Sequence, residues 1–376
     1  MIILTPTFLF CPCGNTARGA NIKSCCNSCD SHNVKTKHHR KEVSMNIKKT
    51  VSVLCAGTIL FFGTQAMAAD DYKVTLKLSH VFSPAEQLTK SMDAVAKAIL
   101  EKTDGAINIQ TFPQAQLPAY KEGVEQVVRG AKFISVEDPS FIGDYVPDFK
   151  ALYAPMLYRS FDEYVKVTQS KMVADMKAKA EEQGIKILAL HYIYGFRNLI
   201  TQKVIKTPAD LKGMKIRTPG SKSYIDTLTA MGAIATPLPW GETLSAVQQG
   251  VVDGLEGSEF TNIGTKVYEG PAKNVANTRH ILGTCGVYIS PKVWAEIPEK
   301  YQTIIQEEFS KGEHHMVELL KSQHGGVVKE LESHGVKFNE VEGETFRSAL
   351  EPLYAEQKGM TPGVFKAIFA ELDAMR

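Results

Sequence analysis

The most informative segment of the chain reads Thr207-Pro-Ala-Asp-Leu-Lys-Gly-Met-Lys-Ile-Arg-Thr-Pro219. It begins with a predicted short helix, because Thr207 suits the N-cap and Pro208 suits the first helical position. A predicted strand follows over Met214–Thr218. Arg217 therefore lies near the end of a strand, at an edge of the predicted sheet.

Strand and helix patterns alternate on both sides of this segment. Upstream, Val74–Leu78 and Ile107–Phe112 alternate like strands, and Gln87–Glu101 places its apolar residues on one helical face. Further helices are predicted over Tyr120–Arg129, Ser223–Met231 and Glu242–Gln249, and further strands over Phe133–Val136, Lys186–Tyr194 and Val251–Leu255. This alternation predicts an α/β architecture with mostly parallel sheets.

One stretch departs from the alternation. Residues Pro298–Gly335 form a nearly continuous helical pattern, which we expect to be interrupted only near Gly325 and Gly326. At about 1.5 Å per residue such a helix is about 50 Å long. That length is most easily placed across two lobes.

The chain has 376 residues, of which 44% are hydrophobic and 22% charged, with a formal net charge of +2. This composition excludes disordered, collagen-like and coiled-coil proteins. Residues 1–68 hold eight basic and two acidic residues, so residues 69–376 hold 35 basic and 39 acidic residues. We therefore expect no nucleic-acid partner.

A leader precedes the predicted fold. From Met45, a positive segment with Lys48 and Lys49 is followed by an apolar stretch, Val51–Phe62, and by Ala66-Met-Ala68. This order is typical of a secretory signal peptide over 45–68, with cleavage after Ala68 and export to the periplasm. We interpret residues 1–44 as an upstream extension that is not translated or is disordered.

No motif for catalysis, cofactor or metal binding was found in residues 69–376. The chain lacks a phosphate-binding P-loop, a His-Glu-x-x-His zinc helix and a Gly-x-Ser-x-Gly nucleophile motif there. We interpret His314, His315 and His324 as a solvated helix face, and Cys285 as a small residue in a tight strand. The cysteines of the first 29 residues lack the spacing and setting of a zinc site. We expect no cofactor, no metal and no enzymatic activity.

Several segments together resemble one family. They are Gly195-Phe-Arg-Asn-Leu199, Thr207–Pro219, Thr236-Pro-Leu-Pro-Trp-Gly-Glu242 and Ala246-Val-Gln-Gln-Gly-Val-Val-Asp-Gly254. In this order and spacing, the chain from Val74 to its C-terminus is similar to the substrate-binding proteins of TRAP transporters, the DctP type. The resemblance implies a two-lobed periplasmic binding protein fold, with crossing hinge strands and a long helix spanning both lobes. It also implies delivery of an organic anion to one small and one large membrane subunit.

The resemblance also implies a domain division and a set of binding residues. We expect lobe I to comprise 69–194 plus 283–322, lobe II to comprise 195–282 plus 323–376, and the hinge to lie near Gly195 and Gly283–Gly286. Arg217 matches the family's carboxylate-binding arginine, whose planar fork suits a bidentate anion contact. The remaining candidate substrate-binding residues are Arg197, Trp240, Glu137, His80 and Ser258.

The substrate class stays open between a sugar acid such as a uronate, a C4-dicarboxylate and a keto acid. Glu137 favours a hydroxylated sugar acid or an amino or keto acid over plain succinate, because a carboxylate that faces an anionic ligand must accept from a hydroxyl or an ammonium group. Many relatives carry an Asn where this chain has Gly257, and Ser258 or Glu259 is a candidate substitute. We expect a monomer. The alternatives are a protein that presents a ligand to a membrane sensor and an exported two-lobed enzyme.

Overall fold

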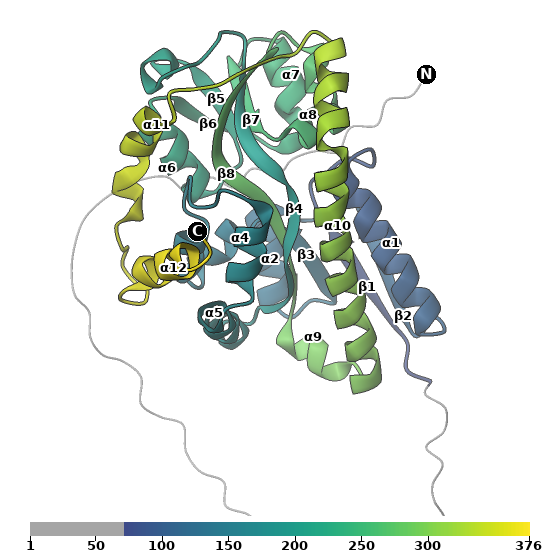
Figure 1. Ribbon diagram of the computed structural model, residues 1–376. Helices are drawn as coiled ribbons and strands as arrows, with labels where there is room; N and C mark the ends of the chain where they lie inside the picture. The colour runs from purple at the N-terminus through teal and green to yellow at the C-terminus, as the bar shows by residue number, and fades with distance from the viewer. Residues whose placement is uncertain (1–70) are drawn as a thin grey trace, which may run out of the picture. The chain divides into compact units, whose positions relative to one another are not determined.

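The computed structural model describes residues 71–376, which form one contiguous fold (Figure 1). The predicted upstream extension and signal peptide lie outside the described residues. Within this part of the chain, no helix is both long enough and apolar enough to cross a membrane.

A mixed nine-stranded sheet runs through the described fold. Its strands are β1 (Val74–Ser79), β2 (Ile107–Phe112), β3 (Phe133–Glu137), β4 (Lys186–Thr201), β5 (Lys215–Thr218), β6 (Ile234–Pro237), β7 (Gly254–Gly257), β8 (Asn274–Ile289) and β9 (Lys337–Asn339). Their order is β2-β1-β3-β8-β4-β7-β5-β6, and β9 pairs with β8. Strands β1 to β3 are parallel, as are β5 to β7, which confirms the mostly parallel prediction.

The two long strands β4 and β8 join the parallel sets and run antiparallel to each other. Each has 16 residues, and their pairing is broken by several register shifts. Gly195 and Gly283 are register partners midway along this pair. Gly195 has φ +113°, and a Cβ there would lie 2.8 Å from the Cβ of Ser258. A side chain at Gly283 would meet the ring of Tyr194, so the crossing requires glycine on both strands.

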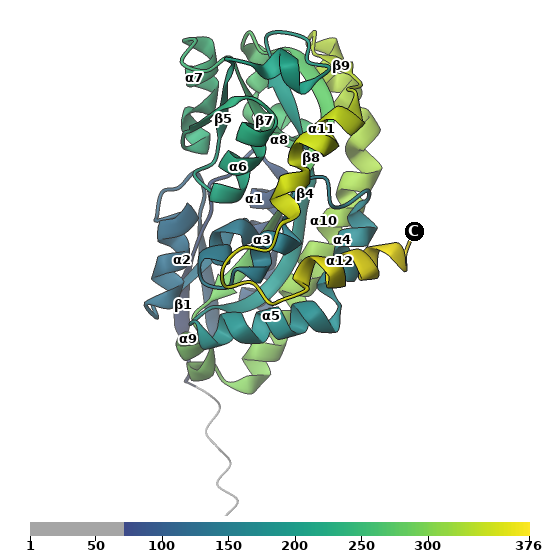
Figure 2. The same ribbon diagram turned by 90° about the vertical axis from the view of Figure 1, so that its left-hand side faces the viewer.

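The helices cover both faces of the sheet (Figures 1 and 2). They are α1 (Gln87–Lys102), α2 (Tyr120–Val128), α3 (Asp148–Leu152), α4 (Phe161–Thr168), α5 (Lys171–Glu182), α6 (Lys222–Ala230), α7 (Thr243–Gln248), α8 (Glu259–Thr265), α9 (Pro291–Glu296), α10 (Glu299–Ser333), α11 (Gly343–Leu350) and α12 (Val364–Asp373). Most predicted elements are confirmed within a few residues. The strand predicted at Val251–Leu255 lies further along, at Gly254–Gly257.

Helix α10 is the long helix that the sequence predicted. It has 35 residues, about 52 Å at 1.5 Å per residue, and packs on α1, on β4 and on α8. The predicted interruption at Gly325 and Gly326 is wrong, because the helix continues through both. Nothing lies within 4 Å of the Cβ position of either glycine, so the pair sits on an open face. The helical turns before and after the two glycines keep the helix continuous, although glycine in a helix interior lowers its stability.

Separate hydrophobic cores lie on the two sides of the β4–β8 crossing. The larger one contains β1 to β3 and most of α10, and two smaller ones contain β5, β7 and α6. The C-terminal helix α12 belongs to the larger core and packs on α3 and α4 (Figure 2). Its apolar side chains therefore pack in the same core as β1 to β3, and the assignment of all of 323–376 to the second lobe stays a prediction.

Candidate functional site

A cavity lies where the two parallel strand sets face each other across the β4–β8 crossing. Its volume is about 40 Å³. Four of the six predicted binding residues line it, namely Arg217, Arg197, Trp240 and Glu137. Strands β3, β4 and β5 carry Glu137, Arg197 and Arg217, and Trp240 begins a single turn of helix after β6.

Arg217 is 1% exposed and makes no ion pair with any carboxylate of the described residues. Its Nε and Nη2 donate to the carbonyl oxygen of Leu238 at 2.9 and 2.7 Å. Its guanidinium lies over the ring of Trp240, 5.1 Å from the centroid. Burial lowers the pKa of Arg217 below its ordinary value, although an arginine remains charged near neutral pH. The strand thus holds a desolvated cation in place without a counter-ion.

Arg197 has a carboxylate partner. Its Nε and Nη2 donate to both carboxylate oxygens of Glu256 on β7, with Nη2 to Oε1 at 2.6 Å. Nη1 donates to the hydroxyl of Tyr194 at 2.8 Å. Burial disfavours ionisation of Glu256, but Arg197 and His280 outweigh it and lower the pKa of Glu256 to about 2. Arg197 therefore lines the cavity as one half of a neutral pair. Sequence reasoning missed Glu256, although it lies in the segment that departs from the relatives.

Glu137 and Tyr120 form a linked pair in the wall. Glu137 Oε1 accepts from the backbone nitrogen of Tyr120 at 2.6 Å, and the Tyr120 hydroxyl accepts from the backbone nitrogen of Trp240 at 2.8 Å. Tyr120 has φ +54°, a strained value for a bulky residue, so these hydrogen bonds hold an unfavourable backbone. Burial raises the pKa of Glu137 to about 8, so this carboxyl is mainly protonated at neutral pH.

His80 and Ser258 do not line the cavity. Ser258 is the N-cap of α8, where its Oγ accepts from Thr261 N and donates to the carbonyl oxygen of Tyr194 at 2.6 Å. His80 is fully buried directly before the lining residue Val81. Both of its ring nitrogens lack a hydrogen-bond partner, and burial lowers its pKa to about 4.

A second group of buried polar atoms adjoins the cavity. Glu86 Oε2 accepts from Trp240 Nε1 at 3.3 Å, while Glu86 Oε1 has no partner. Burial raises the pKa of Glu86 to about 7. Asn262 follows the lining residue Thr261, and neither its amide oxygen nor its amide nitrogen has a partner. Unsatisfied buried polar atoms are uncommon, so this group indicates a place where a polar ligand would be accommodated.

Hydrogen bonds also connect the two sides of the cleft. Asp138, after β3, accepts from the hydroxyl of Tyr224 on α6 at 2.6 Å. Ser221, before α6, donates to the hydroxyl of Ser140 at 2.7 Å. No motif in a single sequence indicated these pairs, because each joins residues more than 80 positions apart.

Known proteins share the sequence pattern and the fold of this chain. The family model described as bacterial extracellular solute-binding protein, family 7 (DctP), matches residues 78–359. The chain belongs to this family. Such TRAP-type proteins are periplasmic, bind small organic acids and work with membrane subunits of the transporter. The members compared below are solute-binding proteins and not enzymes.

Three similar proteins bear on the site. A TRAP periplasmic solute-binding protein from Desulfovibrio salexigens, solved in complex with diglycerolphosphate, is 87% identical with a TM-score of 0.81, covering 81% of this chain and 98% of that chain. One from Fusobacterium nucleatum with bound sn-glycerol-3-phosphate is 41% identical with a TM-score of 0.79, covering 80% and 98%. The sialic acid-binding protein SiaP of Vibrio cholerae is 28% identical, covering 80% of this chain and 93% of its own.

Proposed function

We propose that this protein captures a monoanionic glycerol phosphodiester, such as diglycerol phosphate, and delivers it to TRAP membrane subunits. The observation that carries the proposal is the buried Arg217 guanidinium, which lines the cavity without a carboxylate partner. The family resemblance implied that Arg217 binds the carboxylate group of an organic acid. The phosphodiester is preferred because the 87% identical relative was solved with one.

Charge supports a ligand with one negative charge. Arg197 and Glu256 neutralise each other, and the raised pKa of Glu137 keeps that carboxyl mainly uncharged at neutral pH. Arg217 is then a cation without a carboxylate partner, since the lining Asp138 accepts from Tyr224 and makes no ion pair with it. A phosphodiester carries one charge, whereas a C4-dicarboxylate brings two and leaves one of them buried without compensation. The same argument keeps a monocarboxylate sugar acid as the competing ligand.

The donors of Arg217 fit a tetrahedral anion. Leu238 O accepts two of the five guanidinium N–H groups and the Tyr120 hydroxyl accepts a third, so two remain. Arginine binds phosphate through parallel N–H donors that fix orientation as well as charge. In our proposal the phosphate lies against these remaining N–H groups and on the side of Trp240.

The unpartnered polar groups suit the hydroxyls of glyceryl arms. A hydroxyl can donate to Glu86 Oε1 and to the amide oxygen of Asn262, and can accept from its amide nitrogen. His80 offers one donor and one acceptor when neutral, as its lowered pKa implies. A polyol that reaches these groups would make hydrogen bonds that the fold leaves unmade.

Admission of such a ligand requires the lobes to part. A cavity of about 40 Å³ is far smaller than typical ligand pockets of roughly 300–1,000 Å³. We place the hinge at the Gly195–Gly283 pair and towards Gly286, and the lobe boundaries at these positions remain a prediction. Ligand contacts on both sides would then favour the closed arrangement over the open one.

Calorimetric titration of residues 69–376 tests the proposal. The ligands are diglycerol phosphate, sn-glycerol 3-phosphate, L-galactonate and sialic acid. We expect diglycerol phosphate to bind most tightly. Arg217→Ala should weaken it at least 100-fold, since charge-assisted hydrogen bonds contribute about 1.5–3 kcal/mol each. Arg347→Ala, an arginine on the surface of α11, is the matched control and should bind like the unaltered protein. Tighter binding of either sugar acid would overturn the phosphodiester assignment.

A further inference from the structure

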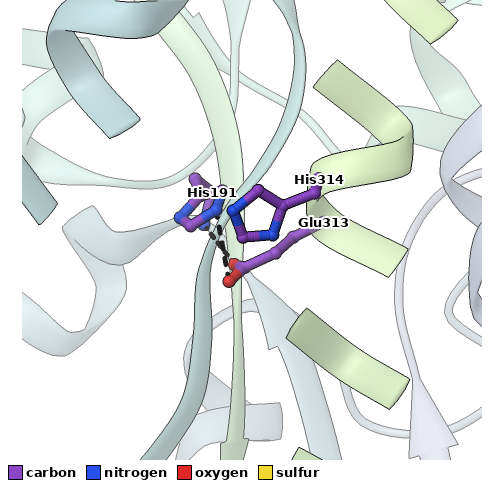
Figure 3. A group of neighbouring side chains, drawn as sticks. All are labelled: His191, Glu313 and His314. Carbon is purple, nitrogen blue, oxygen red and sulfur yellow. Dashed lines mark hydrogen bonds and ion pairs between the residues drawn. The ribbon is translucent and has the colours of Figure 1, made fainter. Parts of the chain in front are cut away.

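Away from the cleft, three potential metal ligands meet where α10 crosses β4. They are His191 on β4 and the neighbouring Glu313 and His314 on α10 (Figure 3). One ligand atom from each lies within 4.8 Å of the others. His191 and Glu313 are buried, whereas His314 is exposed, so the cluster opens to solvent on one side.

From this arrangement we propose that His191, Glu313 and His314 form a binding site for a divalent transition metal ion, with zinc as the best match. Two imidazoles, one carboxylate and an open fourth position are a frequent protein ligand set for Zn²⁺. This departs from the sequence expectation that His314 belongs to a merely solvated helix face.

The hydrogen bonds of the two histidines direct a lone pair of each ring toward the cluster. His314 Nδ1 lies 2.7 Å from the carbonyl oxygen of Ser310, which can only accept, so Nδ1 carries the proton and Nε2 is left to bind a metal. On His191, Nδ1 faces the hydroxyl of Thr168 at 3.5 Å. Because that hydroxyl donates its own proton to Val165 O, its oxygen is available to accept from Nδ1–H of His191, the tautomer that leaves a lone pair on Nε2. Metal-binding histidines commonly use their second nitrogen in this way.

Glu313 is held in the matching position. Its Oε2 accepts from the backbone nitrogens of Leu190 and His191, both at 3.1 Å. Its Oε1 lies 3.2 Å from His191 Nε2, which is buried and has no hydrogen-bond partner. Two ligands of one tetrahedral zinc, at about 2.0–2.2 Å from the metal, are separated by a similar distance. A cation between these two acceptor atoms would relieve their mutual repulsion.

Lys177, on α5, is a cation whose charge acts on both His191 and Glu313. A bound ion would tie the long helix α10 to β4 only a few residues before the Gly195 crossing. It would thereby stiffen the first lobe next to the proposed hinge.

Titration of residues 69–376 with ZnCl₂, after removal of metals with a chelator, tests the site. This segment contains all the described fold and omits the cysteine-rich N-terminus. We expect one Zn²⁺ per chain with a dissociation constant in the micromolar range or below. His314→Ala should weaken it at least 10-fold. His315→Ala, the adjacent exposed histidine, is the matched control and should leave it unchanged.

Cobalt provides a second readout. The variant used with it changes the exposed His314 and leaves the buried His191 in place, so the fold around β4 is not disturbed. Co²⁺ bound by two imidazoles and a carboxylate should show the visible absorption of a tetrahedral complex, and His314→Ala should abolish it. The proposal is wrong if zinc does not bind stoichiometrically, or if His314→Ala binds it as tightly as His315→Ala. Because Arg217→Ala leaves this cluster intact, it should bind zinc normally, which separates this site from the proposed ligand site.

Discussion

The cleft contains two buried arginines whose surroundings differ. Arg197, on the long strand β4, is neutralised by Glu256 through both carboxylate oxygens. Arg217, on the short strand β5, has a carbonyl oxygen, a tryptophan ring and a tyrosine as neighbours. One cation is therefore compensated by a carboxylate within the fold, and the other is not. In our proposal the difference separates a residue that shapes the wall of the cleft from a residue that binds the anionic ligand.

The largest expected effect comes from removing the internal counter-ion. Glu256→Gln leaves Arg197 buried and unpaired, and breaking a buried pair in this way typically costs about 3–5 kcal/mol. Arg217→Met removes a cation that has no partner, and we expect the free energy of unfolding to stay within about 1 kcal/mol of the unaltered protein. Urea unfolding of both variants without ligand measures the contrast. Equal destabilisation by the two substitutions would show that the arginines are not differently compensated.

A second prediction concerns Glu137, the carboxyl that lines the cavity together with the two arginines and is mainly protonated at neutral pH. The pKa of folded Glu137, about 8, is above its unfolded value. Its contribution to stability is therefore complete below the unfolded pKa and is lost as the pH rises through about 8. Between pH 6 and pH 8 this loss is about 2 kcal/mol, since one pKa unit corresponds to 1.36 kcal/mol.

Glu137→Gln should remove this part of the pH dependence, because glutamine does not titrate. The measurement is urea unfolding at pH 6, 7 and 8 in both proteins. Glu86, whose pKa is also raised, remains in both and so cancels in the comparison. Parallel curves would mean that Glu137 is ionised in the fold, and the argument for a ligand with a single negative charge would fail.

The sequence predicted the position of Arg217 but not the ion pair of Arg197 with Glu256. Local pattern predicted the strand that carries Arg217, and the family resemblance predicted its role; the long helix was predicted because its periodicity extends over more than 30 residues. The pairing of Arg197 with Glu256 was missed, since it depends on the register between β4 and β7, which local pattern does not specify. The same holds for Asp138 with Tyr224. The helix continues through the exposed Gly325 and Gly326 because the turns on either side of them hold it, which local propensity does not show.

The smallest predicted effect tests whether the two sides of the cleft must meet for the ligand to bind tightly. Ser221 precedes α6 without capping it, and instead its hydroxyl donates to Ser140 across the cleft at 2.7 Å. Ser221→Ala removes one neutral hydrogen bond, worth about 0.5–1.5 kcal/mol, from the closed arrangement. Ligand affinity should fall about 3- to 10-fold, because the closed state becomes a smaller fraction of the population. Ser223→Ala, on the same helix but with no side-chain hydrogen bond across the cleft, should change affinity less than 2-fold. Because the bond adds little to either core, thermal unfolding without ligand should be nearly unchanged in both variants. If Ser221→Ala binds like Ser223→Ala, closure is determined by the ligand's contact with Arg217 alone and the hydrogen bonds between the lobes are incidental to it.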